Sequence, residues 1–196
     1  MEKSKVYFTN FRARPGYNLL QKLDKLSRKA GIENIDFKNK YVIWSSYRPE
    51  DDGVLVAYAS IHGNTAKAAK KMAQILEQKG AKKVVITDLS RDDMAEAIED
   101  AFRYDKIIFA ASTYNATVFP VMASFLRQLA GKNYQNKKVG IIENGTWAPA
   151  AAKAMLDIIS TMKNIDVCEN ILTIKSVLNE NSREQMNKLA TEILSK

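Results

Sequence analysis

The sequence predicts an α/β fold in which a doubly wound, parallel sheet of five strands is covered by helices on both faces. From residue 53 onward, short apolar runs alternate with segments that have helical spacing of apolar residues. The runs are continuously apolar, which is typical of parallel strands buried on both faces. Glycine, proline and polar capping residues separate the segments, so the boundaries between strands and helices can be predicted as well.

Each expected element has its own signal. We expect strands at 53–58, 83–87, 106–111, 138–143 and 170–176, and helices at 65–79, 92–102, 120–130, 149–163 and 182–194. Gly80 ends the first helix, Pro120 occupies the first turn of the third, and a serine or asparagine caps the last. Strand order 2-1-3-4-5 is one common solution for this alternation, and it places a ligand site at the carboxyl ends of strands 1 and 3. The alternation alone leaves other doubly wound orders open.

Residues 1–44 are expected to form a short β-α-β extension, followed by a linker at 45–52 and the main domain at 53–196. The extension consists of a strand at 5–9, an amphipathic helix at 18–30 and a strand at 37–44. Much of the net charge of +8 lies here, because residues 1–50 hold 11 Lys/Arg against 5 Asp/Glu. The basic residues at 22–29 surround leucines at helical spacing, which indicates the solvated face of a helix and not a nucleic-acid interface.

Composition excludes several classes of protein. Hydrophobic residues make up 46% of the chain, which is ordinary for a globular protein, and no apolar run approaches the roughly 18 residues of a membrane span. The N-terminus lacks the apolar core of a signal peptide, so we expect a cytoplasmic protein without membrane contact. The single cysteine, Cys168, and the single histidine, His62, exclude an intrachain disulfide, the usual zinc sites and a His-rich di-iron site.

The loop after the first strand has the composition of a phosphate-binding loop. It consists of Ser60, Ile61, His62, Gly63, Asn64 and Thr65. Amides at the N-terminus of a helix favour an anion, hydroxyls add donors, and a glycine permits close approach. The loop matches neither a P-loop nor the G-x-G-x-x-G dinucleotide pattern. The alternative interpretation is a helix cap with a tight turn.

Two further loops extend this predicted site. One follows the third strand and contains Ser112, Thr113, Tyr114 and Asn115, and the other follows the fourth and contains Asn144, Gly145, Thr146 and Trp147. Tyr114 and Trp147 are suited to stacking on a planar ring, although ordinary packing is the alternative for both. Because the carboxyl ends of parallel strands meet at one edge of the sheet, the three loops are expected to form one site.

Residues 53–196 resemble the flavodoxin family, and more narrowly the C-terminal flavodoxin domain of the A-type flavoproteins, also called flavodiiron proteins. The resemblance rests on Tyr-Ala-Ser-Ile-His-Gly-Asn-Thr at 58–65, Ser-Thr-Tyr-Asn-Ala at 112–116 and Glu-Asn-Gly-Thr-Trp-Ala-Pro at 143–149, and the segment at 44–50 is similar to the family's linker. It implies the flavodoxin-like strand order 2-1-3-4-5 and bound FMN. Residues 60–65 would hold the phosphate, and the other two loops would flank the isoalloxazine ring, with Trp147 stacking on it.

The chain also departs from that family. The metallo-β-lactamase-like domain that holds two irons in flavodiiron proteins has no counterpart in this sequence. Residues 5–42 instead resemble the start of an uncharacterised group of iron–sulfur-associated proteins from anaerobes, without the cysteine cluster. The sequence leaves open whether the chain is a natural fusion, a remnant or an engineered joint.

These features together predict an FMN-binding electron-transfer flavoprotein that acts as an electron carrier more than as a stand-alone oxidoreductase. The alternatives are an FMN-dependent NAD(P)H or quinone reductase and an interaction module that has lost its cofactor. The expected partner is a ferredoxin-, rubredoxin- or reductase-like redox protein, and a homodimer is compatible with the sequence. No general acid, nucleophile or catalytic metal is expected, because FMN carries the redox chemistry.

Overall fold

The computed structural model describes residues 42–195, and the chain divides into two units between Ser46 and Tyr47. The extension expected before residue 42 lies outside the described residues. The strand expected at 37–44 is wrong at its end, because residues 42–45 form a helical turn in which the Ser46 amide donates to the Val42 carbonyl (3.2 Å). Strand β1 (Asp51–Ala59) begins within the segment that we expected to be a linker. Among residues 42–195, we find no helix that combines the length and the apolar composition needed to cross a lipid bilayer.

The predicted parallel sheet and its strand order are confirmed. The path through the sheet runs β2-β1-β3-β5-β6, and β7 also pairs with β5. These pairings are all parallel. The remaining strands of this path are β2 (Val84–Asp88), β3 (Tyr104–Tyr114), β5 (Gln135–Asn144) and β6 (Lys163–Val167), and β7 (Leu172–Ile174) lies beside β5 off the path. Since β1 and β3 are the neighbours at which the chain reverses direction across the sheet, their carboxyl ends mark the switch point of a doubly wound fold.

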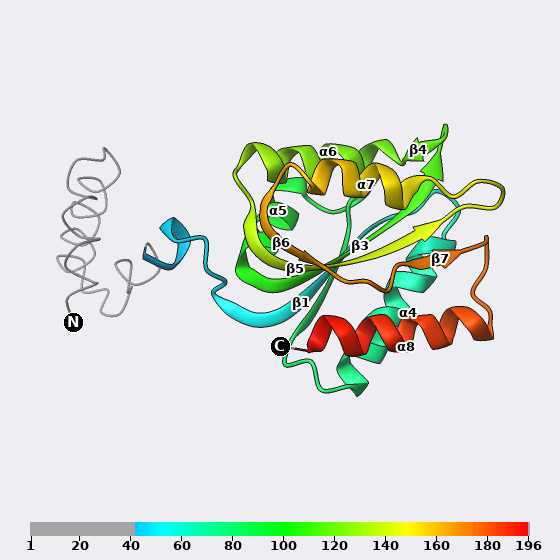
Figure 1. Ribbon diagram of the computed structural model, residues 1–196, viewed down its shortest axis with the longest axis horizontal. Coiled ribbons are helices and arrows are strands. Elements are labelled where there is room, and N and C mark those ends of the chain that lie inside the picture. The colour runs from blue at the N-terminus through cyan, green and yellow to red at the C-terminus, as the bar shows by residue number, and fades with distance from the viewer. Residues whose placement is uncertain (1–41, 196) are drawn as a thin grey trace. The chain divides into compact units, whose positions relative to one another are not determined.

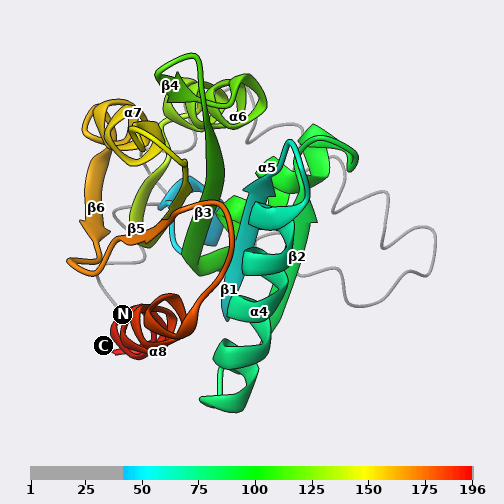
Figure 2. The ribbon, with the colours of Figure 1, turned by 90° about the vertical axis from the view of Figure 1, so that its right-hand side faces the viewer.

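Helices cover both faces of the sheet, as Figure 2 shows. Helices α5 (Met94–Arg103), α6 (Pro120–Gly131) and α7 (Ala151–Ile159) lie on one face, and α4 (Asn64–Gln78) and α8 (Glu180–Leu194) lie on the other. Side chains of β1 alternate between the two apolar cores. Leu55, Ala57 and Ala59 belong to the first cluster, and Val54, Val56 and Tyr58 to the second. This double burial explains the continuous apolar runs in the sequence.

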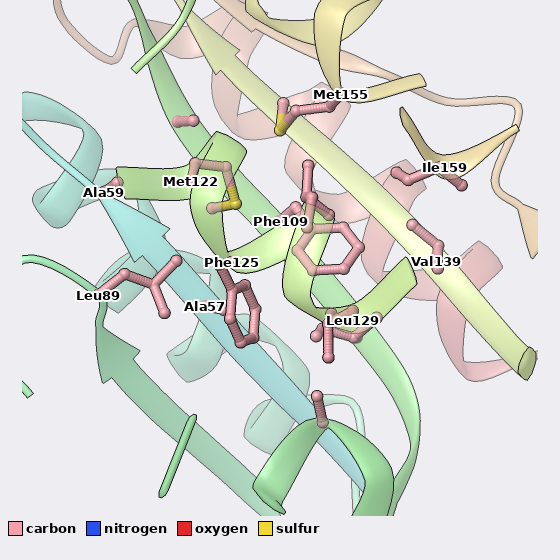
Figure 3. Packing of buried hydrophobic residues seen from close by; sticks show 14 of the residues in the cluster. Ala57, Ala59, Leu89, Phe109, Met122, Phe125, Leu129, Val139, Met155 and Ile159 are labelled. Atoms are coloured by element: carbon pink, nitrogen blue, oxygen red, sulfur yellow. The ribbon is translucent and has the colours of Figure 1, made fainter. Parts of the chain in front are cut away.

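The core between the sheet and α5 to α7 contains a fully buried aromatic pair (Figure 3). Phe125 of α6 packs edge-to-face against Phe109 of β3, with ring centroids 6.2 Å apart. Met122 and Leu129 flank Phe125 on the same helix, and all four side chains are fully buried.

The expected fourth helix and fifth strand have different boundaries in the structure. Helix α7 ends at Ile159, four residues before the expected end, and the fifth strand is divided into β6 and β7. Residues 164–167 alternate between exposed and half-buried side chains, as expected for the outermost strand of the sheet path. The sequence of β6 has no continuous apolar run, which is the signal of a strand in the centre of a parallel sheet, and so it did not predict this strand.

Cys168 lies between the two halves of this strand. Its amide donates to the Val139 carbonyl (2.8 Å), which continues the β5 ladder. Its side chain is buried, and burial raises the pKa of the thiol to about 12. The thiolate, which is the reactive form, is therefore disfavoured at neutral pH.

A hairpin after β3 was not predicted. Strand β4 (Thr117–Val118) returns antiparallel to β3, and the connecting residues Asn115 and Ala116 have φ values of 47° and 56°. A two-residue loop with both φ values positive is the geometry of a type I′ turn, for which Asn-Gly is the usual signal. Ala116 in the second position hid this turn from the sequence.

Lys137 is an ionisable residue inside the domain, with only 3% of its surface exposed. Its ammonium donates to the carbonyls of Phe102 (2.7 Å) and Tyr104 (2.6 Å), where α5 meets β3. Burial lowers the pKa of Lys137 to about 8. The folded state therefore releases this proton at a lower pH than the unfolded chain does.

We expect the free energy of unfolding of the wild type to rise relative to Lys137→Met as the pH increases above 8. In that range the unfolded chain binds one proton more than the folded one at this residue, so stability increases with pH. The gain between pH 7 and pH 10 is expected to be about 2 kcal/mol. Urea unfolding of both proteins at several pH values measures it, and Lys138→Met controls for the loss of one positive charge. A difference that stays constant with pH would contradict the prediction.

Candidate functional site

A cleft of about 550 Å³ lies at the carboxyl ends of the strands. In Figure 1 the loops that follow β5 and β7 and the β3–β4 hairpin lie on the same side of the domain. The cleft is lined by Ser60, Ile61, His62, Asn64, Thr65, Ser112, Thr113, Tyr114, Asn115, Asn144, Gly145, Thr146 and Ser176. It is thus located where the strand order reverses, which is the expected ligand position in this fold class.

The first wall of the cleft is the loop between β1 and α4. Gly63, the N-cap residue of α4, has a φ of 83°, a left-handed conformation that glycine adopts without strain. Its amide donates to Ser60 Oγ (3.0 Å). Within the described part of the chain no side chain caps α4, and its first turn carries no acidic residue. The N-terminus of α4 therefore presents amide donors and the positive end of the helix dipole to the cleft.

The second wall comes from the end of β3 and is joined to the first by a pair of hydroxyls. Thr65 Oγ1 and Ser112 Oγ lie 2.8 Å apart and form a hydrogen bond. Thr65 is only 1% exposed, so this contact fixes the first turn of α4 against β3. At the rim of the same wall, Tyr114 is 44% exposed and packs edge-to-face against Phe119 (ring centroids 5.9 Å apart).

The third wall, at 144–147, is attached to the second by the Thr113 side chain. Thr113 Oγ1 accepts hydrogen bonds from the amides of Ala150 (3.1 Å) and Ala151 (3.2 Å) and so caps α7 from the end of β3. Gly145 lies so close to it that an added Cβ would be 2.9 Å from Thr113 Oγ1 and 3.0 Å from Pro149 Cα. A glycine is thus required at 145, because the loop packs closely against the end of β3 and against its own residue Pro149.

Glu143 of β5 holds this third wall in place. Its sequence position did not mark it as an individual site residue. Its buried carboxylate accepts from the Ala152 amide of α7 (2.8 Å) and from the Thr173 hydroxyl of β7 (2.8 Å). One side chain thus links β5 to the N-terminus of α7 and to β7, immediately before the loop that lines the cleft.

Ser176 is a cleft residue that the sequence analysis missed. It lies in the loop between β7 and α8, at the end of a segment that we had expected to be a strand. Its backbone is bound by the Asn144 side chain and its hydroxyl by Thr146, at 2.7 Å. No local signal in the sequence marks it, because its partners are about 30 residues away.

The structure brings together most of the predicted site. Twelve of the fourteen predicted residues line the cleft, whereas Gly63 and Trp147 do not. Gly63 shapes the loop through its backbone conformation. The Trp147 side chain is 97% exposed on the loop of the third wall, and its stacking role stays a prediction.

A model of the flavodoxin domain matches residues 55–166. The chain belongs to this family. Anaerobic nitric oxide reductase flavorubredoxin from Aeromonas hydrophila is 29% identical to it over 113 residues, or 57% of this chain and 23% of that protein. This flavodoxin domain therefore spans less than a quarter of that relative's length.

Solved structures show the same fold. Rubredoxin oxygen:oxidoreductase from the anaerobe Desulfovibrio gigas superimposes with a TM-score of 0.74 at 22% identity, over 80% of this chain and 38% of that one. A flavodoxin from the domain Archaea superimposes with a TM-score of 0.62 at 20% identity, over 72% of this chain and 95% of that one. Flavodoxin-like domains bind FMN. Across residues 42–195, we find no group of three or more His, Cys, Asp or Glu side chains arranged to hold a metal.

Proposed function

We propose that the flavodoxin domain of this chain binds FMN non-covalently in the cleft and transfers electrons through it. The observation that carries the proposal is the N-terminus of α4, which has no side-chain cap from residues 42–195 and opens into a cleft lined by hydroxyls and amides. A phosphate monoester bound there would accept from the first-turn amides of α4. Ser60 and Asn64 line the same wall and supply further polar groups.

The remaining walls suit the rest of the cofactor. A volume of about 550 Å³ is in the range of small-molecule sites, and both Tyr114 and Trp147 have exposed aromatic surface on the loops around the cleft. The bound flavin supplies the electron chemistry, and the residues of the cleft bind and orient it. The loops at 60–66, 112–119 and 144–149 contain no acidic residue, so they do not repel the phosphate.

For the partner we propose another redox protein of the ferredoxin, rubredoxin or reductase type. Rubredoxin appears in the name of the Desulfovibrio gigas protein, and flavorubredoxin is the name of the Aeromonas relative. Because the sequence holds one histidine, we propose that reduction of oxygen or nitric oxide at a His-rich di-iron centre is not an activity of these 196 residues.

The visible absorption spectrum of the purified protein, before and after addition of FMN, tests the proposal. A flavin band that stays with the protein through gel filtration, together with quenched tryptophan fluorescence, is the expected result. Bleaching of that band by NAD(P)H alone would favour the reductase alternative. A protein without a flavin band that ignores added FMN would contradict FMN binding altogether.

We expect Trp147→Ala to weaken FMN binding about tenfold and to leave the melting temperature nearly unchanged. Loss of one aromatic stacking contact accounts for a change of that size, and a side chain that is 97% exposed contributes little to the core. Fluorescence titration of the full chain measures the affinity. Trp44→Phe, at the other tryptophan, is the control and should retain both the affinity and the quenching signal. Equal affinity of Trp147→Ala and wild type would contradict the stacking role.

A further inference from the structure

The loop between β7 and α8 contributes Ser176 to the cleft. The three loops that predicted the site follow β1, β3 and β5, so this is a fourth loop. Three contacts hold this residue. Its amide donates to Asn144 Oδ1 (3.0 Å), its carbonyl accepts from Asn144 Nδ2 (3.2 Å), and its hydroxyl bonds with that of Thr146 (2.7 Å). Asn144 is itself buried, so the amide pair is shielded from water.

Ser176 has a strained backbone. Its φ of 69° is in the left-handed region, and the amide of Val177 donates to the carbonyl of Lys175 at 2.9 Å. An i to i+2 hydrogen bond around a residue with positive φ describes the rare, strained form of the γ-turn. Such a conformation costs on the order of 1 kcal/mol for a serine and persists only where surrounding contacts impose it. Here the Asn144 side chain imposes it by binding both backbone polar groups of Ser176.

The hydroxyl pair of Thr146 and Ser176 retains hydrogen-bonding capacity. Each hydroxyl has one proton and two lone pairs, and the bond between them uses one proton and one lone pair. Within the part of the chain that the structure describes, one O–H group therefore remains free to donate. Since both residues line the cleft, this O–H group faces the space in which a ligand oxygen would accept its hydrogen bond.

We propose that Ser176 is a ligand-contacting residue, whose hydroxyl, together with that of Thr146, donates a hydrogen bond to an oxygen acceptor of the bound flavin nucleotide. Asn144 is the positioning residue, because it holds the γ-turn that directs the loop to the cleft. The inference rests on the proposed FMN site and adds a fourth loop to it. The acceptor belongs either to the phosphate or to the ribityl and ring portion of the ligand.

The test measures binding of FMN and of riboflavin, which lacks the phosphate, to the full chain by fluorescence titration. Ser176→Ala removes only the hydroxyl, and Ser176→Gly removes both the hydroxyl and the strain. Both are expected to weaken FMN binding about three- to tenfold, as loss of one hydrogen bond predicts. Ser160→Ala, on an exposed serine that bonds to the Asp157 carbonyl at the end of α7, is the matched control and should bind as wild type does.

The two ligands assign the acceptor. An equal loss for FMN and riboflavin places it on the ribityl or ring portion, and a loss for FMN alone places it on the phosphate. Wild-type affinity for both ligands in Ser176→Ala and Ser176→Gly would overturn the proposal and leave Ser176 a structural residue. Failure of the wild type to bind FMN would instead overturn the proposed function, so the two failures are distinguishable.

Asn144→Ala tests the positioning role separately. Without the amide the γ-turn loses two hydrogen bonds, and we expect FMN affinity to fall at least tenfold. In the double variant with Ser176→Gly, which removes the strain, the effect of Asn144→Ala should be smaller. If the two substitutions change the free energy of FMN binding additively, Asn144 does not act by holding this turn. Asn164→Ala, at another asparagine with positive φ (51°), is the control and should leave FMN binding unchanged.

Discussion

Glu143→Ala is expected to lower the free energy of unfolding by about 3 kcal/mol and to weaken FMN binding about tenfold. The carboxylate accepts two hydrogen bonds, from the Ala152 amide and the Thr173 hydroxyl, and a bond to a charged group contributes about 1.5–3 kcal/mol. Alanine leaves both donors without this acceptor in a region that is largely shielded from water. Because the cleft loop begins at the next residue, its position should become less well defined. Urea unfolding and fluorescence titration measure the two effects.

Two further variants separate the causes. Glu143→Gln keeps one amide oxygen as an acceptor and should lose about 1 kcal/mol, roughly the difference between a charged and a neutral hydrogen bond. Adding Thr173→Val to Glu143→Ala removes one of the stranded donors, so the double variant should be more stable than the sum of the two single changes predicts. Strict additivity, or a fully stable Glu143→Ala protein, would show that the carboxylate does not link β5, α7 and β7.

Features that depend on neighbouring residues could be predicted from the sequence. Continuous apolar runs located the central strands β1, β3 and β5, and the polar residues that follow these strands located three walls of the cleft. A glycine with positive φ, Gly63, lies where the first wall was expected to turn. These signals are local, because a strand buried on both faces and a loop at its carboxyl end each have a characteristic composition.

Features that depend on distant partners could not be predicted. Thr113 was chosen as a ligand-binding residue, and its hydroxyl caps α7 through two amides that follow it by almost 40 residues. Ser176 lies in the cleft, held by the Asn144 side chain at the end of the neighbouring strand β5. Strand β6 was also not predicted, because its place at the end of the sheet is decided by pairing with β5. The outermost strand needs only one apolar face, so its sequence alternates and has no continuous apolar run.

Phe125→Ala is expected to lower the free energy of unfolding by about 3–5 kcal/mol. The side chain is fully buried between α6 and β3, and its ring packs edge-to-face against Phe109. Alanine leaves a cavity that the neighbouring helix and sheet fill only in part, and the aromatic contact is lost. Unfolding in urea, followed by circular dichroism, measures the change.

The same variant also tests whether stability and ligand binding are separable in this domain. Phe125 belongs to the core beneath α6 and does not line the cleft, so the folded fraction of Phe125→Ala should bind FMN within about twofold of wild type. Phe125→Leu, which retains most of the apolar volume, should lose only about 1–2 kcal/mol. A large loss of FMN affinity in Phe125→Ala under folding conditions would mean that the core helix positions the cleft. The loss of FMN affinity in Glu143→Ala would then be explained equally well by a general loss of packing.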